Sequence, residues 1–520
     1  MDKNSDFRAQ YFNIKRGKCQ KNTLFAPDLL QISEKSCIFA ADLINTGMEI
    51  IGRTEEMAQL KRYAASIQPE FVAMYGRRRV GKTFLINKTL GEQMVFETSG
   101  VLMGEKDDQF EAFNQSLRRI GYKGKTPRKW MDMFFALEQT LTPNLDSNKR
   151  QIIFIDELPC FDVKGTRFVA ALGHFWNSWV SKHDNLMLIV CGSATSWMVD
   201  NIVNNHGGLH DRITHLMHLH PFTLAQTEQY MQARQFKWDR LAILQAYMVF
   251  GGIPYYLSLI EPKESVAGAI DRLLFSKKGE LRTEYERLFV SLFTNPAPYI
   301  AIVQVLAKHR YGLTRIEIAD VLKKSNGGNL SEQLDNLVKC DFVSYYRTKT
   351  KKINKNGGIY VLADHFTQFF HSFVDGETDE LFWTHNLRSP KVNTYFGLSF
   401  ERVCMAHIPQ IKKALGIDQI GTEYYSWRSN DPNQRAQVDL IIERADRLIN
   451  LCEIKYSATT YTIDKSEDLK LRIRQAAFVD QTETRYGIMP TFITTYGLTP
   501  NGYASNILNS VVIDDLFIKE

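Results

Sequence analysis

The 520-residue sequence lacks the features that define several large classes of protein. Its seven cysteines are scattered and include no C-x-x-C pair, so neither a disulfide framework nor a cysteine-bound zinc site is indicated. It contains no apolar run of the ~18 residues that a transmembrane helix needs, and its first residues, MDKNSDFRAQ, form no apolar signal region. It also contains no internal repeat. These absences predict a cytoplasmic protein without a membrane partner.

The composition is that of an ordinary folded protein. Hydrophobic residues make up 44% of the chain and charged residues 23%, which excludes a disordered or coiled-coil chain. The net charge of +6 is too dilute to indicate nucleic-acid binding without a local concentration of basic residues. At roughly 150 residues per domain, the length predicts about three domains.

The first half of the chain predicts a tail followed by an α/β domain. Residues 1–47 show no sustained periodicity, and we expect a poorly ordered tail, either a real extension or the result of a misassigned start. From Met48, helix-length segments alternate with short apolar runs, which predicts a parallel sheet covered on both faces over residues 48–222. The expected strands lie at 71–75, 94–98, 152–156, 186–192 and 215–222.

The second half predicts three further segments. Residues 223–295 have a helical pattern, broken by Gly251-Gly252-Ile253-Pro254, and we expect a helical lid. Residues 296–375 predict three short helices and a hairpin, which is the order of a winged helix. Two of these helices have expected capping boxes, one from Thr314 to Glu317 and one from Asn329 to Glu332. After a polar connection, residues 385–520 predict a second α/β domain.

A phosphate-binding loop stands between the first expected strand and a helix. The sequence GRRRVGKT satisfies G-x-x-x-x-G-K-[ST] in the strand–loop–helix context that this motif requires. Its backbone N–H groups are expected to face phosphate oxygens of ATP, with Lys82 reaching the β- and γ-phosphates and Thr83 ligating Mg²⁺. The expected nucleotide-binding residues are Gly76, Arg77, Arg78, Arg79, Val80, Gly81, Lys82, Thr83 and Phe84.

Two later strand ends complete the expected chemistry of a triphosphatase. IIFIDELP places Asp156 and Glu157 at the end of an apolar strand, where Asp156 would hold Mg²⁺ and Glu157 would act as general base. A strand-end Asp-Glu pair also commonly caps a following helix, which is the alternative. Ser193 ends the next strand and would sense the γ-phosphate, although a plain turn serine is the alternative.

The motifs taken in order resemble a known family. IIGRTEE (50–56) looks like the hhGRxxE motif of the AAA+-related STAND ATPases, and GRRRVGKT, IIFIDELP, LIVCGSA, LHDRIT and GGIPYYL look like motifs of the prokaryotic archaeal-type ATPases. The resemblance implies a five-stranded core, a helical lid and a homo-oligomer as one option. It also implies that Arg212 contacts the γ-phosphate, in cis or across a subunit interface, and that Arg53 lies on the adenine side. A structural ion pair is the alternative for Arg212.

A basic segment follows the three expected helices. Arg347, Lys349, Lys351, Lys352 and Lys355 occur without an acidic residue and end in an Asn-Gly-Gly turn. They are expected to form a wing that contacts DNA phosphates. The expected recognition helix carries Glu332 and Asp335, which would repel the DNA backbone. The alternative is therefore a charged hairpin on a protein-binding module.

The last segment carries four polar residues in strongly patterned surroundings. Glu401 lies on an expected helix, Asp439 on one strand, and Glu453 and Lys455 on the same face of the next strand. Two carboxylates and one lysine can support metal-assisted phosphodiester hydrolysis. The pattern resembles the PD-(D/E)xK nucleases, which implies a metal site at Glu401, Asp439 and Glu453 with Lys455 as a catalytic residue. The proline usual before the first acidic residue is absent.

These features predict an α/β protein with a P-loop ATPase core, a helical lid, a winged helix and a C-terminal domain like a restriction endonuclease. The leading hypothesis is an Mg²⁺-dependent ATPase that controls a DNA-directed nuclease-like domain. The alternative is an ATP-dependent signalling or assembly switch, in which the last domain is inactive and binds a protein partner.

Overall fold

The computed structural model describes residues 50–146, 148–203, 209, 211–293, 295–347, 358–429 and 436–519. The expected tail at 1–47 lies outside these residues, as do Lys349, Lys351, Lys352 and Lys355 of the expected wing. In the described part of the chain, no helix is both long and apolar enough to cross a membrane.

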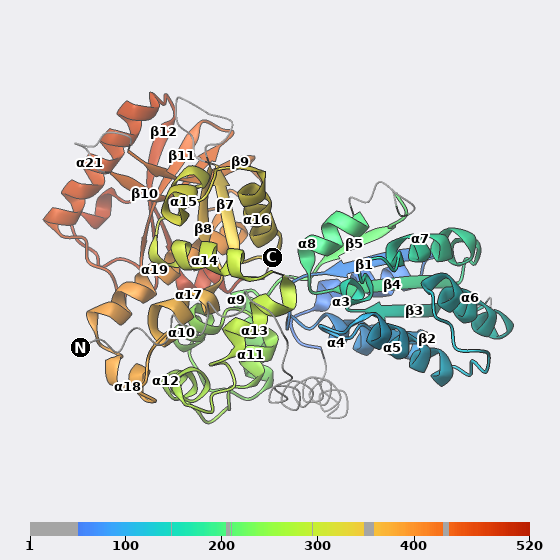
Figure 1. The fold of residues 1–520 in the computed structure, drawn as a ribbon. Helices are drawn as coiled ribbons and strands as arrows, with labels where there is room; N and C mark the ends of the chain where they lie inside the picture. The colour runs from blue at the N-terminus through green and yellow to red at the C-terminus, as the bar shows by residue number, and fades with distance from the viewer. Residues whose placement is uncertain are drawn as a thin grey trace. The chain divides into compact units, whose positions relative to one another are not determined.

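A five-stranded parallel sheet organises the first part of the described chain (Figure 1). The strand order is β2-β3-β4-β1-β5, so the strand that leads into the P-loop lies between β4 and β5. The five expected strands are confirmed, although β5 ends at His218 and does not extend to residue 222. The strands are β1 (Glu70–Tyr75), β2 (Met94–Ser99), β3 (Gln151–Asp156), β4 (Leu186–Gly192) and β5 (His215–His218).

Alternating side chains on these strands enter two different cores. Phe71 and Ile153 face a cluster rich in aromatic rings that includes Phe113 and Trp130, whereas Val72 faces the opposite cluster. Because both faces are covered, the strands can be apolar along their whole length. The helices of this part are α3 (Thr54–Ala64), α4 (Lys82–Leu90), α5 (Lys106–Arg119), α6 (Trp130–Leu141), α7 (Phe168–Ser178) and α8 (Thr195–Met198).

The next segment is helical, as the sequence predicts for the lid. Its chain turns at Gly252, where an added Cβ would lie 1.9 Å from the carbonyl oxygen of Phe222, so only glycine permits this approach of two backbones. The described helices are α9 (Leu224–Ala233), α10 (Arg240–Phe250), α11 (Pro254–Ser258), α12 (Val266–Ile270) and α13 (Glu284–Leu292).

Residues 297–362 contain three helices and a small antiparallel sheet. The elements are α14 (Ala297–Lys308), β6 (Leu313–Thr314), α15 (Arg315–Leu322), α16 (Gly328–Lys339), β7 (Val343–Arg347) and β8 (Gly358–Leu362), with the sheet order β6-β8-β7. The capping box of Thr314 and Glu317 is confirmed. That of Asn329 and Glu332 is wrong, because α16 already begins at Gly328 and Asn329 accepts a hydrogen bond from Gln333 within the helix.

Three helices connect this module to the last segment: α17 (His365–Phe369), α18 (Phe382–Asn386) and α19 (Pro390–Ala406). A second five-stranded sheet follows, with the order β13-β12-β11-β10-β9. Its strands and helices are α20 (Ile408–Ala414), β9 (Thr422–Arg428), β10 (Gln437–Arg444), β11 (Leu448–Lys455), α21 (Lys465–Thr482), β12 (Gly487–Thr494), β13 (Asn509–Val512) and α22 (Ile513–Leu516). This segment thus contains both helices and strands.

Candidate nucleotide site and its connections

The P-loop joins β1 to α4 with a backbone that two glycines make possible. Gly76 and Gly81 have φ values of 148° and 91°. A Cβ on Gly76 would lie 2.3 Å from the carbonyl oxygen of Leu219, so the loop lies directly against the segment after β5. Val80 is buried, whereas Arg78 and Phe84 are half-buried. The loop backbone and the start of α4 therefore present N–H groups at the carboxyl end of the sheet.

Lys82 is buried, and its ammonium group donates hydrogen bonds to carbonyl oxygens of the loop. Its Nζ donates to the carbonyl oxygens of Gly76 and Arg77 at 2.9 and 3.1 Å, and to Ser193 Oγ at 3.2 Å. These contacts hold the ammonium group over the loop, where phosphate oxygens can replace the weaker neutral acceptors.

Asp156 and Thr83 meet at the adjacent strand end. Thr83 Oγ1 donates to Asp156 Oδ2 at 2.8 Å, and the backbone N–H of Glu157 donates to Asp156 Oδ1 at 2.9 Å. Burial, followed by repulsion from Glu157, raises the pKa of Asp156 to about 6. A hydroxyl and a carboxylate are oxygen donors of the kind that Mg²⁺ prefers, so the pair fits the predicted metal role.

Glu157 is connected to Lys82 through Ser193. Ser193 Oγ donates to Glu157 Oε1 at 2.7 Å, and the backbone N–H of Ser193 lies 3.2 Å from Glu157 Oε2. Glu157 itself has a φ of 44°, in the left-handed region, which turns its side chain toward β4. The structure therefore brings Lys82, Glu157 and Ser193 together, as expected for these three site residues.

Two P-loop arginines point away from the loop into buried ion pairs. Arg77 forms a bidentate pair with Asp364, with Nη2 and Oδ2 2.9 Å apart, and its guanidinium lies over the Phe342 ring. Arg77 and Asp364 are 3% and 4% exposed. Burial alone would raise the pKa of Asp364, but the charge and hydrogen bonds of Arg77 outweigh it and lower that pKa.

Arg79 makes the equivalent contact with the helical segment. Its Nε and Nη2 donate to the two carboxylate oxygens of Glu284 at 2.5 and 2.9 Å, and its guanidinium stacks 3.9 Å from the Tyr255 ring centroid. The sequence assigned Arg77 and Arg79 to nucleotide binding. In the structure only their backbone N–H groups remain available for phosphate, because the side chains bind Glu284 and Asp364.

Arg53 braces the same region from the start of α3. It donates to the carbonyl oxygens of His220 and Val80 at 2.8 and 3.3 Å, pairs with Glu56 at 2.9 Å, and lies over the Phe222 ring. Its side chain thus joins the P-loop to the segment after β5.

Arg212 does not reach the P-loop in this chain. It lies in the turn before β5. This turn is at the end of the sheet where β1 begins, because the Thr214 N–H donates to the Phe71 carbonyl oxygen. The P-loop follows the opposite end of the parallel strand β1, so the in-cis version of the Arg212 prediction is wrong for this geometry. Arg212 is exposed, and its role across a subunit interface stays a prediction.

Comparison with known proteins identifies the segment that carries this site. Residues 50–260 match the family described as "ATPase domain predominantly from Archaea". This segment is therefore similar in sequence to the archaeal-type ATPase domains.

Individual relatives are distant. An uncharacterized protein of Methanocaldococcus jannaschii is 23% identical over 367 residues, which cover 70% of this chain and 78% of that protein. The Walker-type ATPase of Pyrococcus abyssi matches with a TM-score of 0.45 and 19% identity, over 62% of this chain and 96% of that chain. A STAND protein of Pyrococcus horikoshii matches with a TM-score of 0.30 and 13% identity, over 70% and 55%.

Outside the ATPase domain, the C-terminal carboxylates lie on adjacent elements. The register of β10 and β11 pairs Leu440 with Cys452, which places Asp439 opposite Glu453. Burial and repulsion from Asp439 raise the pKa of Glu401 on α19, and burial and repulsion from Glu453 raise the pKa of Asp439. The structure therefore brings Glu401, Asp439 and Glu453 into one electrostatic neighbourhood.

Glu453, however, is held by two cations. Lys455 Nζ lies 2.7 Å from its Oε1, and Arg474 Nη1 lies 2.6 Å from its Oε2. Among the described residues, the three carboxylates do not form a group whose ligand atoms all lie within 4.8 Å of one another. The predicted three-carboxylate metal site is thus not assembled, and both Glu453 oxygens are bound by cations.

One cavity connects the ATPase domain to these carboxylates. Its volume is about 630 Å³, and its lining includes Arg53, Arg77, Gly252, Arg402, Glu401 and Asp439. The cavity thus lies between the ATPase domain and the last segment, although Lys82, Asp156 and Glu157 do not line it. Neither Glu453 nor Lys455 lines it. The sequence motifs did not predict that these arginines and carboxylates line one cavity.

Substitution of the two central catalytic candidates should separate binding from hydrolysis. Lys82→Ala should abolish measurable ATP affinity, because it removes the buried charge that faces the phosphates. Glu157→Gln should keep ATP affinity and lose turnover by at least ~100-fold, because glutamine can still accept from Ser193 but cannot accept a proton. Fluorescent-nucleotide titration and phosphate release measure the two effects.

The matched control is Glu97→Gln, on the exposed edge strand β2 of the same sheet, which should leave both quantities unchanged. Unchanged turnover in Glu157→Gln would contradict the assignment of Glu157 as general base.

Metal binding should depend on the ionisation of Asp156. Its pKa is raised to about 6, so the carboxyl is increasingly protonated, and a poorer cation ligand, as the pH falls below that value. The affinity for Mn²⁺, used as a paramagnetic probe of the Mg²⁺ site without nucleotide, should therefore fall about tenfold per pH unit below the pKa and level off above it. Asp156→Asn should bind weakly at every pH. An affinity that stays constant from about pH 5 to about pH 8 would contradict the role of Asp156.

Proposed function

We propose that this chain is an Mg²⁺-dependent ATPase whose nucleotide state controls the segments that follow the ATPase domain. The observation that supports this most directly is that two side chains of the P-loop, Arg77 and Arg79, form buried ion pairs with residues 287 and 205 positions away. A loop that only held phosphate would need its backbone and Lys82 alone. In this chain any shift of the loop also moves Glu284 and Asp364.

The residues of the site have distinct roles in this proposal. Thr83 and Asp156 would hold Mg²⁺, which neutralises charge on the β- and γ-phosphates when it is bound. Lys82 exchanges its bonds to Gly76 and Arg77 for bonds to phosphate oxygens. Glu157 accepts the proton of the attacking water, while Ser193 orients the Glu157 carboxylate and approaches the γ-phosphate.

Asp364 is placed to pass a change in the P-loop to the next module. Its Oδ2 both binds Arg77 and accepts the backbone N–H of Thr367, so it caps the start of α17. When Arg77 moves with the loop, Asp364 must either follow it or lose a bidentate bond in a buried site. Breaking such a pair costs on the order of 3–5 kcal/mol. The cap of α17 is therefore tied to the nucleotide loop.

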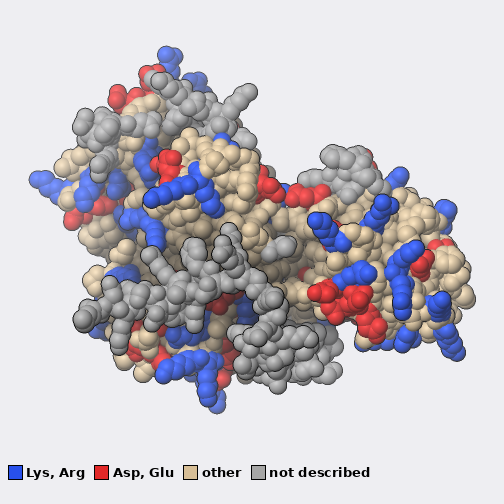
Figure 2. Space-filling view, in the orientation of Figure 1, with Lys and Arg blue, Asp and Glu red and all other residues tan. Residues whose placement is uncertain are grey.

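We propose that residues 297–362 form a winged helix and that DNA is the ligand of this part of the chain. The order helix, short strand, helix, helix and hairpin supports the first proposal. The basic composition of residues 347–355 supports the second. Among the described residues on the face drawn in Figure 2, basic and acidic side chains are interleaved.

The experiment that tests the proposal measures ATP hydrolysis with and without double-stranded DNA. We expect DNA to stimulate the wild-type rate, and Lys351→Ala combined with Lys352→Ala to lower the slope of log affinity against log salt by about 2. The control is Lys123→Ala with Lys125→Ala, in the loop after α5. Hydrolysis that ignores DNA but changes the oligomer size would instead support the assembly switch.

A metal-dependent nuclease is the second candidate function, and the like-charge pair of Glu401 and Asp439 favours it. Two carboxyl groups with raised pKa values in one cavity are stabilised by a divalent cation. Lys455 and Arg474 would have to release Glu453 for it to join them. If Glu453 stays bound to these cations, the domain is inactive in cleavage and serves binding or assembly.

Cleavage assays with Mg²⁺ and Mn²⁺ distinguish these two cases. If the site is a nuclease, Glu401→Gln and Asp439→Asn should each lower cleavage of plasmid DNA by at least ~100-fold, without changing ATP hydrolysis in the absence of DNA. Asp446→Asn, in the turn between β10 and β11, is the matched control and should cleave like wild type. If wild-type protein cleaves no DNA with or without ATP, the nuclease proposal is wrong and the domain serves binding or assembly.

A further inference from the structure

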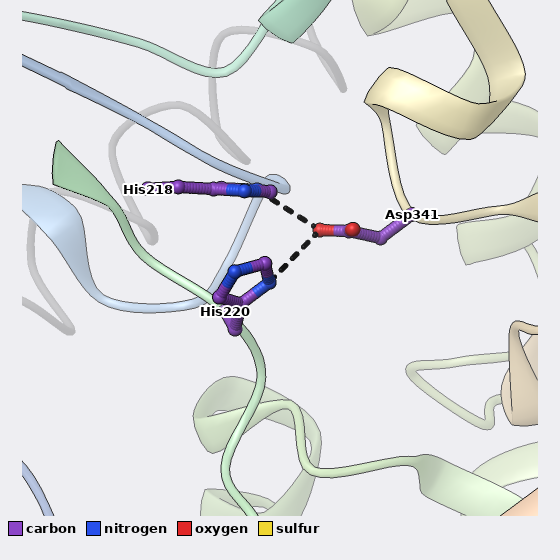
Figure 3. Close-up of side chains that lie close together, drawn as sticks. All are labelled: His218, His220 and Asp341. Atoms are coloured by element: carbon purple, nitrogen blue, oxygen red, sulfur yellow. Dashed lines mark ion pairs between the residues drawn. The ribbon is translucent and has the colours of Figure 1, made fainter. Parts of the chain in front are cut away.

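Two histidines and an aspartate from distant parts of the chain converge beside the ATPase site (Figure 3). His218 is the last residue of β5, and His220 lies two residues later. Asp341 lies in the turn between α16 and β7. His218 Nε2 and His220 Nδ1 lie 3.1 and 3.7 Å from Asp341 Oδ2. One ligand atom from each residue lies within 4.8 Å of the other two.

The contact between His218 and Asp341 is an ion pair in a buried place. His218 Nε2 and Asp341 Oδ2 are both buried and lie 3.1 Å apart, without the geometry of a hydrogen bond. A cation bound between these two atoms would be coordinated by both of them.

The spacing of the three atoms suits a metal ion. Ligands at 2.0–2.1 Å in a tetrahedral site lie roughly 3.3 Å from one another. The two measured nitrogen–oxygen separations, 3.1 and 3.7 Å, fall on either side of that value. Two imidazole nitrogens and one carboxylate oxygen are the donors that Zn²⁺ and similar transition metals prefer, whereas Mg²⁺ prefers oxygen alone.

We propose that His218, His220 and Asp341 bind one divalent transition metal ion of the zinc class, separate from the Mg²⁺ of the nucleotide site. The ion connects the end of β5 to the turn after α16. His220 is 61% exposed, so the ion can enter from solvent, and a water completes its coordination. Arg77, whose charge also acts on Asp341, is already paired with Asp364.

The surroundings hold the ligands in place before the ion binds. The His218 ring stacks on Tyr75 of β1, with centroids 4.6 Å apart and planes 16° apart. Arg53 fixes the His220 backbone through a 2.8 Å bond to its carbonyl oxygen. Asp341 has a φ of 60°, in the left-handed region, which directs its side chain toward the histidines. The metal therefore stabilises the contact between the ATPase domain and residues 297–362.

Metal binding by the purified full-length protein tests this proposal directly. After chelation and dialysis, wild-type protein should bind about one Zn²⁺ per chain, and Co²⁺ should give the visible absorption bands of a nitrogen–oxygen site. His218→Asn and Asp341→Asn should each lower the affinity for Zn²⁺ by at least ~10-fold. Asparagine is used at position 341 because it tolerates the left-handed backbone. Zinc should raise the melting temperature of wild-type protein only.

The matched control is His215→Asn, on the same strand, where the histidine pairs with Glu70 instead of Asp341. It should bind Zn²⁺ like wild type. Should His218→Asn or Asp341→Asn fail to fold, His220→Asn at the exposed position gives the same test. Zinc that binds wild type and all variants equally, or no saturable binding to wild type, would overturn the proposal and leave an ion pair between the two segments.

Discussion

The structure depends on the buried ion pairs that Arg77 and Arg79 form with Asp364 and Glu284. A P-loop with three successive arginines would carry an excess of unpaired positive charge in a buried site. Here two of those charges are neutralised by carboxylates from later segments, which bind them in bidentate geometry. Because an uncompensated buried charge is so costly, the loop, the helical segment and α17 must move together or not at all.

Charged residues also line the space between the ATPase domain and the later segments. The cavity next to these pairs is lined by arginines from the ATPase domain and by Glu401 and Asp439 from the last segment. Tyr75, Arg53 and Phe222 hold the end of β5 and the segment after it near the P-loop, and His218 and His220 from this region face Asp341. Two kinds of polar contact therefore connect the ATPase domain to later residues: the ion pairs of Arg77 and Arg79, and the contacts of the two histidines with Asp341.

Local patterns in the sequence predicted the parts of the site that are close together in the chain. The P-loop, the strand-end Asp156 and the alternation of Glu453 and Lys455 follow from motifs of a few residues. The structure pairs Thr83 with Asp156 and Lys455 with Glu453. The partners of Arg77 and Arg79 were missed, since no periodicity connects residues hundreds of positions apart. The His-x-His pattern at 218–220 was a visible signal, but its third member, Asp341, becomes apparent only from the fold. The capping box predicted for α16 is wrong, because the helix begins at Gly328 and Asn329 lies inside it.

Hydrogen exchange at α17 and the segment after it tests the central claim most directly, since Asp364 both caps this helix and binds the P-loop. The account predicts that a non-hydrolysable ATP analogue changes the exchange rates of residues 365–374 in wild-type protein but not in Lys82→Ala, which cannot bind it. It also predicts that Asp364→Asn abolishes the change while ATP still binds. Exchange at 365–374 that is identical with and without the analogue, at saturating occupancy of the P-loop, would contradict the account.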